Sequence, residues 1–212
     1  MAQVKLLLVC GPWSSGTTAV AGLLAKLGVA GLDPYFRSND PRTRNTYESI
    51  AFREVIHAVA SEESLSLRPR IDVMPHLREF HARILNRQPG DYHGPVFLKY
   101  PLSALVIPQI CELFDTRLIY VLRPLLDIEA TRRRRNWFEY LGAKGAAKIY
   151  AAMFNALVNY PFPTTIVRYP ELVSSPVEHV LKLVEFAQLK VGPNTIREAS
   201  DFVLKPDPAY KC

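Results

Sequence analysis

The first 27 residues constrain the fold most, because they join a short apolar run, a glycine-bearing loop and an apolar segment with helical spacing. Residues 4–9 have the length and character of a strand buried inside a parallel sheet. Gly11 and Pro12 end this run, since neither suits the interior of a regular element. From Gly16 onward, apolar residues recur at helical spacing as far as Leu27. This order brings backbone N–H groups and the positive end of a helix dipole to one point, which predicts a phosphate site.

The loop also carries many hydroxyl donors, namely those of Ser14, Ser15, Thr17 and Thr18. The spacing Gly11-x4-Gly16 is that of a P-loop, but Thr17 stands where a nucleotide triphosphatase has lysine. Because that lysine normally reaches the terminal phosphates, its absence argues against hydrolysis of ATP or GTP. A strand–turn–helix with ordinary cap residues is the alternative, and the density of hydroxyls makes it weaker.

Length and composition predict one domain over residues 1–212. A chain of 212 residues with 49% hydrophobic and 22% charged residues is typical of a single globular domain. Apolar runs with strand character alternate with segments of helical spacing along the whole chain. This alternation favours an α/β fold of three layers, α/β/α, with a central parallel sheet.

The cysteines and the net charge limit which cellular compartment, metal and partners we expect. Cys10, Cys111 and Cys212 are far apart and odd in number, so they predict neither a disulfide framework nor a metal site. No apolar run reaches the roughly 20 residues of a membrane span, and the N-terminal run is too short for a signal peptide. We therefore expect a cytoplasmic protein without a metal. The net charge of +6 permits anionic partners, but basic and aromatic residues are not interleaved, so no nucleic-acid partner is expected.

Two later strand ends carry candidate site residues. Residues 95–101 are predicted to form a buried strand that ends at Lys99. A lysine there lies at the carboxyl edge of a parallel sheet, where α/β proteins bind ligands, although it could equally extend into solvent. The clearest strand, residues 117–122, ends at Arg123. On the helix expected after it, Thr131 shares a face with the residue four positions earlier.

Three further segments give local expectations. Residues 47–59 have helical spacing, with Asn45 or Thr46 as the cap, which places Glu48 in the first turn. A glutamate there usually complements the helix dipole, and only its context could make it a catalytic base. Residues 61–69 are expected to be a linker or a flexible loop. Ser103 is expected to cap a helix.

Three segments together resemble the sulfotransferases that use 3′-phosphoadenosine 5′-phosphosulfate (PAPS), over most of the chain. Residues 11–18 resemble the 5′-phosphosulfate loop of that family. Residues 120–123, with Thr131 eight positions after the arginine, resemble its 3′-phosphate motif. Residues 167–176 are similar to the strand and turn that place an aromatic residue near the adenine. The resemblance implies a P-loop NTPase-like fold.

The resemblance also implies site residues. The cofactor-binding residues would be Gly11, Trp13, Ser14, Ser15, Gly16, Thr17 and Thr18 in the loop, Arg123 and Thr131 at the 3′-phosphate, and Tyr169 at the adenine. The family has a basic residue where this chain has Ser14. In the glycan-modifying branch, a lysine followed shortly by proline lies near the transferred group, and Lys99 resembles it. That branch has a glutamate base where Glu48 stands, and His57 is the second candidate for the base.

The implied reaction moves the sulfuryl group of PAPS to a hydroxyl or amine of a small-molecule or glycan acceptor and releases adenosine 3′,5′-bisphosphate (PAP). Arginines in residues 33–46 and 61–72 hint at an anionic acceptor. Two alternatives stay open. One is an inactive relative that binds nucleotide or a partner, having lost activity with the basic residue of the loop. The other is a P-loop kinase of nucleotides or small molecules, which would need a phosphate-reaching lysine and Mg²⁺ ligands.

Overall fold

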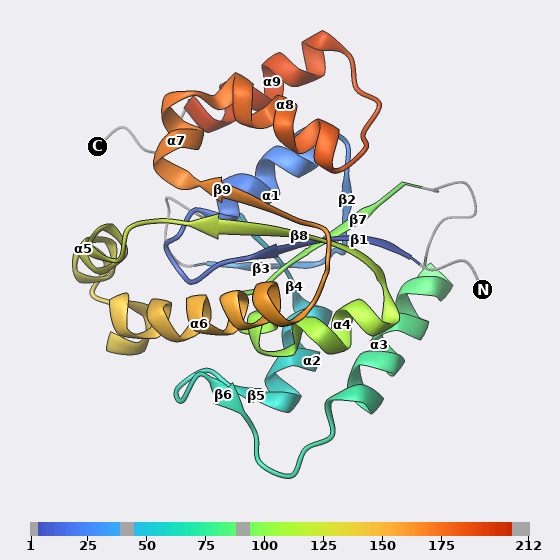
Figure 1. Ribbon diagram of the computed structural model, residues 1–212, viewed down its shortest axis with the longest axis vertical. Coiled ribbons are helices and arrows are strands. Elements are labelled where there is room, and N and C mark those ends of the chain that lie inside the picture. Colours follow the sequence, from blue (N-terminus) through green and yellow to red (C-terminus); the bar gives the residue numbers. More distant parts are fainter. Residues whose placement is uncertain (1–3, 39–44, 88–93, 205–212) are drawn as a thin grey trace.

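A five-stranded sheet forms the centre of the molecule, in a computed structural model that describes residues 4–38, 45–87 and 94–204 (Figure 1). The strand order is β2-β7-β1-β8-β9, and all neighbouring strands are parallel. The strands are β1 (Lys5–Cys10), β2 (Ala30–Gly31), β7 (Val96–Lys99), β8 (Asp115–Leu122) and β9 (Thr164–Arg168). Helices lie above and below the sheet, which confirms the predicted α/β class.

The alternation of side chains along β1 explains why its sequence is apolar at nearly every position. Leu6, Leu8 and Cys10 belong to the core on one face of the sheet. Leu7 and Val9 belong to the core on the opposite face. Since successive side chains of a strand point to opposite faces, a strand covered on both sides must be apolar throughout.

Two groups of helices provide these two cores. One face is covered by α1 (Thr17–Lys26), α8 (Pro176–Phe186) and α9 (Pro193–Leu204). The other is covered by α2 (Ile50–Val59), α3 (Val73–Arg87), α4 (Ile107–Leu113) and α6 (Ala143–Asn159). The helices α5 (Leu125–Arg135) and α7 (Tyr169–Ser174) follow the carboxyl ends of β8 and β9, and a short 3₁₀ helix, η3 (Glu139–Leu141), precedes α6.

The prediction of a helix over residues 47–59 is wrong at its start. Residues 45–49 form strand β4 (Asn45–Ser49), which pairs antiparallel with β3 (Tyr35–Arg37). The ring of Tyr47 packs against that of Tyr35, with 5.6 Å between the centroids. The cap of α2 is Ser49, whose side chain accepts a hydrogen bond from the Phe52 N–H at 3.4 Å. Glu48 therefore lies in a strand, because pairing with a distant segment overrides the local helical spacing.

Two smaller expectations also fail. Residues 61–69 are not a linker throughout, since β5 (Ala60–Ser61) and β6 (Ser66–Leu67) pair as a short antiparallel hairpin. Ser103 lies inside a 3₁₀ helix, η2 (Pro101–Val106), and its Oγ donates to the Tyr100 carbonyl at 2.7 Å instead of capping a helix. Among the described residues, no helix is both long and apolar enough to cross a membrane. The extent of the domain over residues 1–212 stays a prediction.

Candidate functional site

The register of the sheet brings the predicted strand ends to one edge. In the pairing of β1 with β7, Val9 lies beside Lys99. In the pairing of β8 with β9, Leu122 lies beside Arg168, so Arg123 and Tyr169 leave their strands at the same level. Because all these strands are parallel, the loop after β1 meets these side chains at their common carboxyl edge, where α/β folds bind ligands.

The loop after β1 has the conformation of an anion cradle. Ser14 and Gly16 have positive φ angles of 64° and 102°, the left-handed geometry that turns successive N–H groups toward one point. The first backbone N–H groups of α1 have no partner within the helix, and its N-cap makes no side-chain hydrogen bond. In the part of the chain that the structure describes, the buried Oγ atoms of Ser14 and Ser15 have no hydrogen-bond partner. Buried hydroxyls without partners fit a site built for an anion.

Two positions of the loop have no room for a Cβ atom and therefore require glycine. A Cβ atom on Gly11 would lie 2.7 Å from the Ser15 Oγ and 2.8 Å from the Val121 carbonyl oxygen. A Cβ atom on Gly16 would lie 2.1 Å from the Tyr169 ring. The ring of Tyr169 therefore lies directly against the loop, and its role at the adenine stays a prediction.

Arg123 connects Tyr169 with the loop. Its Nη1 donates to the Ser14 carbonyl oxygen at 2.9 Å, and its guanidinium carbon lies 5.2 Å from the centroid of the Tyr169 ring. A second contact, 3.9 Å, joins its Nε to a carboxylate oxygen of Asp127. Arg123 and Tyr169, each predicted separately as a site residue, are thus brought together at the loop.

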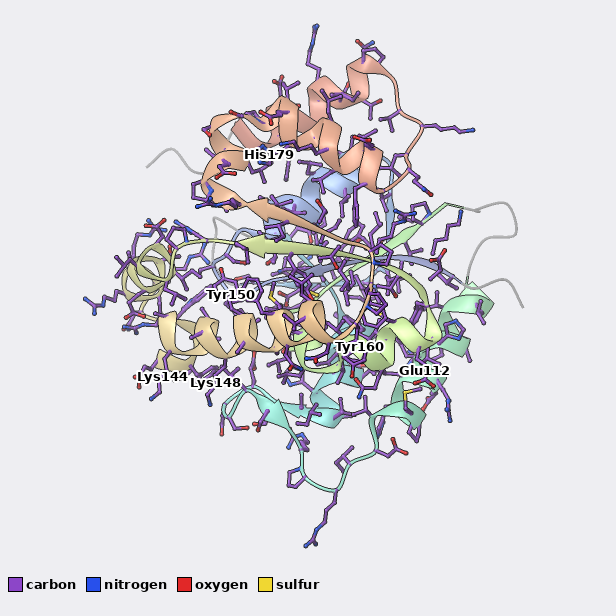
Figure 2. All side chains as sticks on the ribbon, viewed as in Figure 1. Glu112, Lys144, Lys148, Tyr150, Tyr160 and His179 are labelled. Carbon is purple, nitrogen blue, oxygen red and sulfur yellow. The ribbon has the colours of Figure 1, made fainter. Side chains whose placement is uncertain are left out.

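Tyr150, which sequence reasoning missed, holds the backbone of Arg123. This tyrosine extends from α6 toward the sheet (Figure 2). Its hydroxyl oxygen accepts from the Arg123 N–H at 2.8 Å, and its O–H donates to the Arg123 carbonyl at 3.0 Å. Burial raises the pKa of Tyr150, which favours the protonated hydroxyl that this donation requires. Only an apolar helical pattern marked its position in the sequence.

Thr131 is buried on α5, the helix that follows Arg123. Its Oγ1 donates to the Asp127 carbonyl at 2.9 Å, one turn earlier on the same helix. Its position two turns beyond Arg123 agrees with the spacing of the motif, but no contact joins the two side chains among the described residues. A role for Thr131 at a phosphate stays a prediction.

Lys99 is buried beside the loop, so the alternative in which it extends into solvent is wrong. Its side chain is 4% exposed. The Nζ atom donates to the Thr18 Oγ1 at 3.1 Å, to the Thr46 carbonyl at 3.1 Å and to a Glu48 carboxylate oxygen at 2.7 Å. Thr18 lies in the first turn of α1. Lys99 therefore places a cation from β7 at the loop, which has no basic residue of its own.

Glu48 lies between two cations. One carboxylate oxygen accepts from Lys99, and the other accepts from Nη1 of Arg53 on α2. The structure thus brings together the predicted pair of Glu48 and Lys99. It adds Arg53, which sequence reasoning missed because only the fold of β4 against α2 brings it to the carboxylate.

Within the described residues, aromatic neighbours connect His57 to the loop. Its Nε2 lies 2.7 Å from the Tyr100 hydroxyl. The ring of Tyr100 in turn meets that of Trp13 edge-to-face, at 6.3 Å between centroids. Burial lowers the pKa of His57 and raises that of Tyr100, which favours a neutral imidazole beside a protonated hydroxyl, and that hydroxyl also contacts a Glu62 carboxylate oxygen at 3.5 Å. With Nε2 in use, His57 is the weaker candidate for the base.

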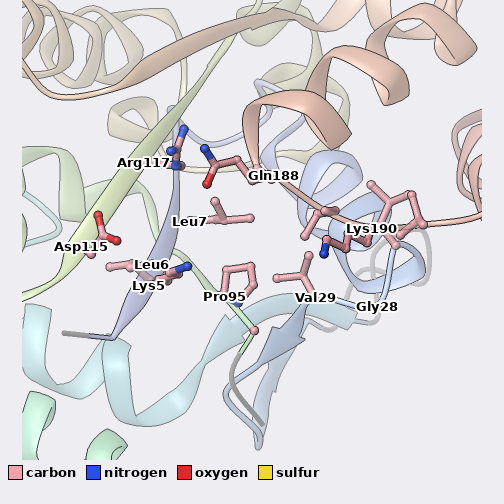
Figure 3. Close-up of a pocket in the computed structure, with 15 residues that line it drawn as sticks. Lys5, Leu6, Leu7, Gly28, Val29, Pro95, Asp115, Arg117, Gln188 and Lys190 are labelled. Atoms are coloured by element: carbon pink, nitrogen blue, oxygen red, sulfur yellow. The ribbon is translucent and has the colours of Figure 1, made fainter. Parts of the chain in front are cut away.

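Two further observations concern metal ligands and a cavity. No group of three or more His, Cys, Asp or Glu side chains in residues 4–38, 45–87 and 94–204 is placed to hold a metal ion. A cavity of about 420 Å³ opens at the opposite edge of the sheet, at the amino ends of β1, β7 and β8 (Figure 3). Lys5, Asp115, Arg117 and Lys190 line it together with apolar residues. None of the predicted site residues belongs to that cavity.

Comparisons with known proteins address the fold. No protein-family model matches the sequence, and no curated protein matches it either. Solved structures do match. A sulfotransferase domain from the curacin biosynthetic pathway superposes with a TM-score of 0.58 at 15% identity, and the match covers 98% of this chain and 80% of that one. The chain has the sulfotransferase fold.

Two other solved structures match this chain with lower TM-scores. A mouse sulfotransferase complexed with PAP matches at 13% identity and a TM-score of 0.54, over 96% of this chain and 65% of that chain. A structure described as a sugar kinase from Janibacter sp. HTCC2649 matches at 14% identity and a TM-score of 0.50, over 91% of this chain and 98% of that one. At these identities the likeness concerns the fold, and the reaction has to be argued from the site.

Proposed function

We propose that this protein transfers the sulfuryl group of PAPS to a hydroxyl or amine of a small-molecule or glycan acceptor and releases PAP. One observation carries the proposal: the buried Lys99 Nζ donates a hydrogen bond to Thr18 at the start of α1. In the adjoining loop, Ser14 stands where the sulfotransferase family has a basic residue. The cation expected at the transferred group thus comes from the neighbouring strand. The buried, unpartnered hydroxyls of Ser14 and Ser15 also fit a phosphate in this loop, within the described residues.

Each site residue has a role in this proposal. PAPS would supply an activated sulfuryl group whose leaving group is PAP. The loop N–H groups of residues 11–16 and the hydroxyls of Thr17 and Thr18 bind the 5′-phosphate, with Trp13 beside them. The 3′-phosphate is bound by Arg123 and Thr131, and Tyr169 packs on the adenine. As in phosphoryl transfer, these groups position the reactants and stabilise charge that develops in the transition state.

The remaining roles concern the proton and the leaving oxygen. Lys99 donates a hydrogen bond to the oxygen that gains negative charge as the S–O bond to PAP breaks. The acceptor oxygen forms the new bond to sulfur, and Glu48 takes its proton. To do so, Glu48 exchanges one of its two ionic contacts. The contact with Arg53 is the one nearer to solvent, since that side chain is 18% exposed and Lys99 is 4% exposed.

The test is a calorimetric titration of the protein with PAP, run beside ATP plus Mg²⁺. We expect micromolar binding of PAP and little heat from ATP. Arg123→Ala should weaken PAP binding by about tenfold or more, the usual cost of one charge-assisted phosphate contact. Lys99→Ala should lower turnover with PAPS more than it lowers PAP affinity.

Three outcomes would contradict the proposal. Preference for ATP would favour the P-loop kinase. PAP binding without turnover across a broad panel of alcohols, phenols, amines and glycans would favour an inactive relative. Unchanged PAP affinity in Arg123→Ala would remove this arginine from the site.

A further inference from the structure

Arg53 is held between two aromatic rings. Its guanidinium carbon lies 4.2 Å from the centroid of Phe36 on β3 and 4.8 Å from that of Tyr100 after β7. A cation on the face of an aromatic ring is stabilised by the ring quadrupole, more strongly where water is excluded. The two rings therefore fix the plane of the guanidinium, which lysine could not reproduce.

This fixed guanidinium is the first member of a chain of contacts that ends at the loop. Arg53 Nη1 donates to one oxygen of Glu48, and the other oxygen accepts from Lys99 Nζ at 2.7 Å. Lys99 then donates to Thr18 at 3.1 Å. The carboxylate is buried and is shared by two cations, so the cluster of Arg53, Glu48 and Lys99 carries one net positive charge.

We propose that Arg53 is a positioning residue that keeps the charge of Lys99 available to the loop, an inference that rests on the proposed function. With Arg53 in place, Glu48 is neutralised from both sides and cancels only part of the Lys99 charge. Without Arg53, Glu48 and Lys99 form a closed one-to-one ion pair. An anion at Thr18 then meets a neutral pair instead of a cation, and its binding weakens.

The experiment compares PAP with adenosine 3′-monophosphate, which lacks the 5′-phosphate that the loop would bind. In Arg53→Met, we expect PAP affinity to fall by about tenfold, the effect of one close charge interaction, while the affinity for adenosine 3′-monophosphate changes by less than about twofold. Arg53→Lys should restore only part of the affinity, because its compact ammonium cannot stack between the rings.

Arg68→Met is the matched control. Arg68 also lies beside α2, where its Nε donates to the His57 carbonyl at 3.0 Å, and both arginines act on the pKa of His57 in the same direction. In the described part of the chain, Arg68 contacts neither Glu48 nor Lys99. We expect Arg68→Met to change PAP affinity by no more than about twofold, the effect of an exposed charge.

A second-site variant separates positioning from general loss of charge. Glu48→Gln in the Arg53→Met background removes the carboxylate that would neutralise Lys99, so PAP affinity should return to the wild-type value or exceed it. Thermal unfolding of each variant shows whether the protein is folded during the titrations.

The outcomes are distinct. Rescue by Glu48→Gln, with a loss specific to PAP, supports the inference. Equal losses in Arg53→Met and Arg68→Met, or a further loss in the double variant, overturn it while leaving the proposed function intact. If the folded wild-type protein fails to bind PAP, the proposed function fails, and the inference fails with it.

Discussion

A comparison of two glycines with positive φ angles distinguishes what the backbone conformation requires from what the candidate site requires. Gly16 and Gly28 have φ angles of 102° and 84°. A Cβ atom on Gly16 would enter the ring of Tyr169, whereas nothing lies within 4 Å of one on Gly28. The two positions therefore share the conformational requirement for glycine, but only Gly16 also keeps Tyr169 against the loop.

This difference gives a prediction for the single residue. Gly28→Ala should lower the free energy of unfolding by about 1–2 kcal/mol, the cost of the left-handed conformation, without changing PAP affinity. Gly16→Ala should cost more, because the Tyr169 ring must also move, and should weaken PAP binding by about tenfold or more. Denaturant unfolding and calorimetry measure the two effects. Equal behaviour of the two variants would mean that Tyr169 does not contribute to the site.

At the scale of elements, helix α6 supports the candidate site although none of the predicted site residues lies on it. The helix α6 packs under the sheet, and Tyr150 holds both backbone polar groups of Arg123 where β8 ends. Proline at position 124 cannot donate a backbone hydrogen bond, so the two bonds of the Tyr150 hydroxyl help to fix the backbone where the chain leaves β8. The backbone of Arg123 is thus held by α6.

Tyr150→Phe should therefore weaken PAP binding as well as lower stability. Loss of the hydroxyl leaves an N–H and a carbonyl of Arg123 without their partner, which costs about 1–3 kcal/mol in a buried setting. Tyr120→Phe is the control, because its buried hydroxyl donates at 2.8 Å to the Met153 carbonyl on the same helix but does not touch Arg123. We expect both variants to lose stability and only Tyr150→Phe to lose PAP affinity. A normal PAP affinity in Tyr150→Phe would show that Arg123 is positioned by other contacts.

At the scale of the whole molecule, two histidines couple stability to pH. Burial lowers the pKa of His57 and of His81 below the ordinary value of 6.5. His81 meets the ring of Phe114 edge-to-face at 4.7 Å, in the layer of α3 and α4. The folded protein therefore binds fewer protons at these positions than the unfolded chain does once the pH falls toward and below 6.5.

The sign of the pH effect follows from this difference. The stabilisation is complete above 6.5 and is lost as the pH falls through the folded pKa values, so the free energy of unfolding should decrease from about pH 7 to about pH 5. The double variant His57→Gln, His81→Gln should show a shallower decrease. Chemical denaturation at several pH values measures both curves, and identical slopes would contradict the assignment.

The sequence determined the fold class and the main candidate residues because these signals are local. The apolar run of residues 4–9, the loop that ends at Gly16 and the alternation of strands and helices each depend on neighbours in the chain. Arg123 and Lys99 could be found because a strand end in a parallel sheet has a known place. The juxtaposition of Arg123 with Tyr169 follows from the same rule.

Only the tertiary structure decided which charges meet. Glu48 lies in β4 because residues 45–49 pair with β3, a contact that no helical or strand period in the sequence specifies. That pairing, with α2 packed beside it, brings Arg53 to Glu48, 5 residues away in the chain, and Glu48 to Lys99, 51 residues away, in one buried cluster. Tertiary packing, and not local propensity, sets such contacts, so Lys99 and Glu48 could each be proposed from the sequence while the contact with Arg53 could not.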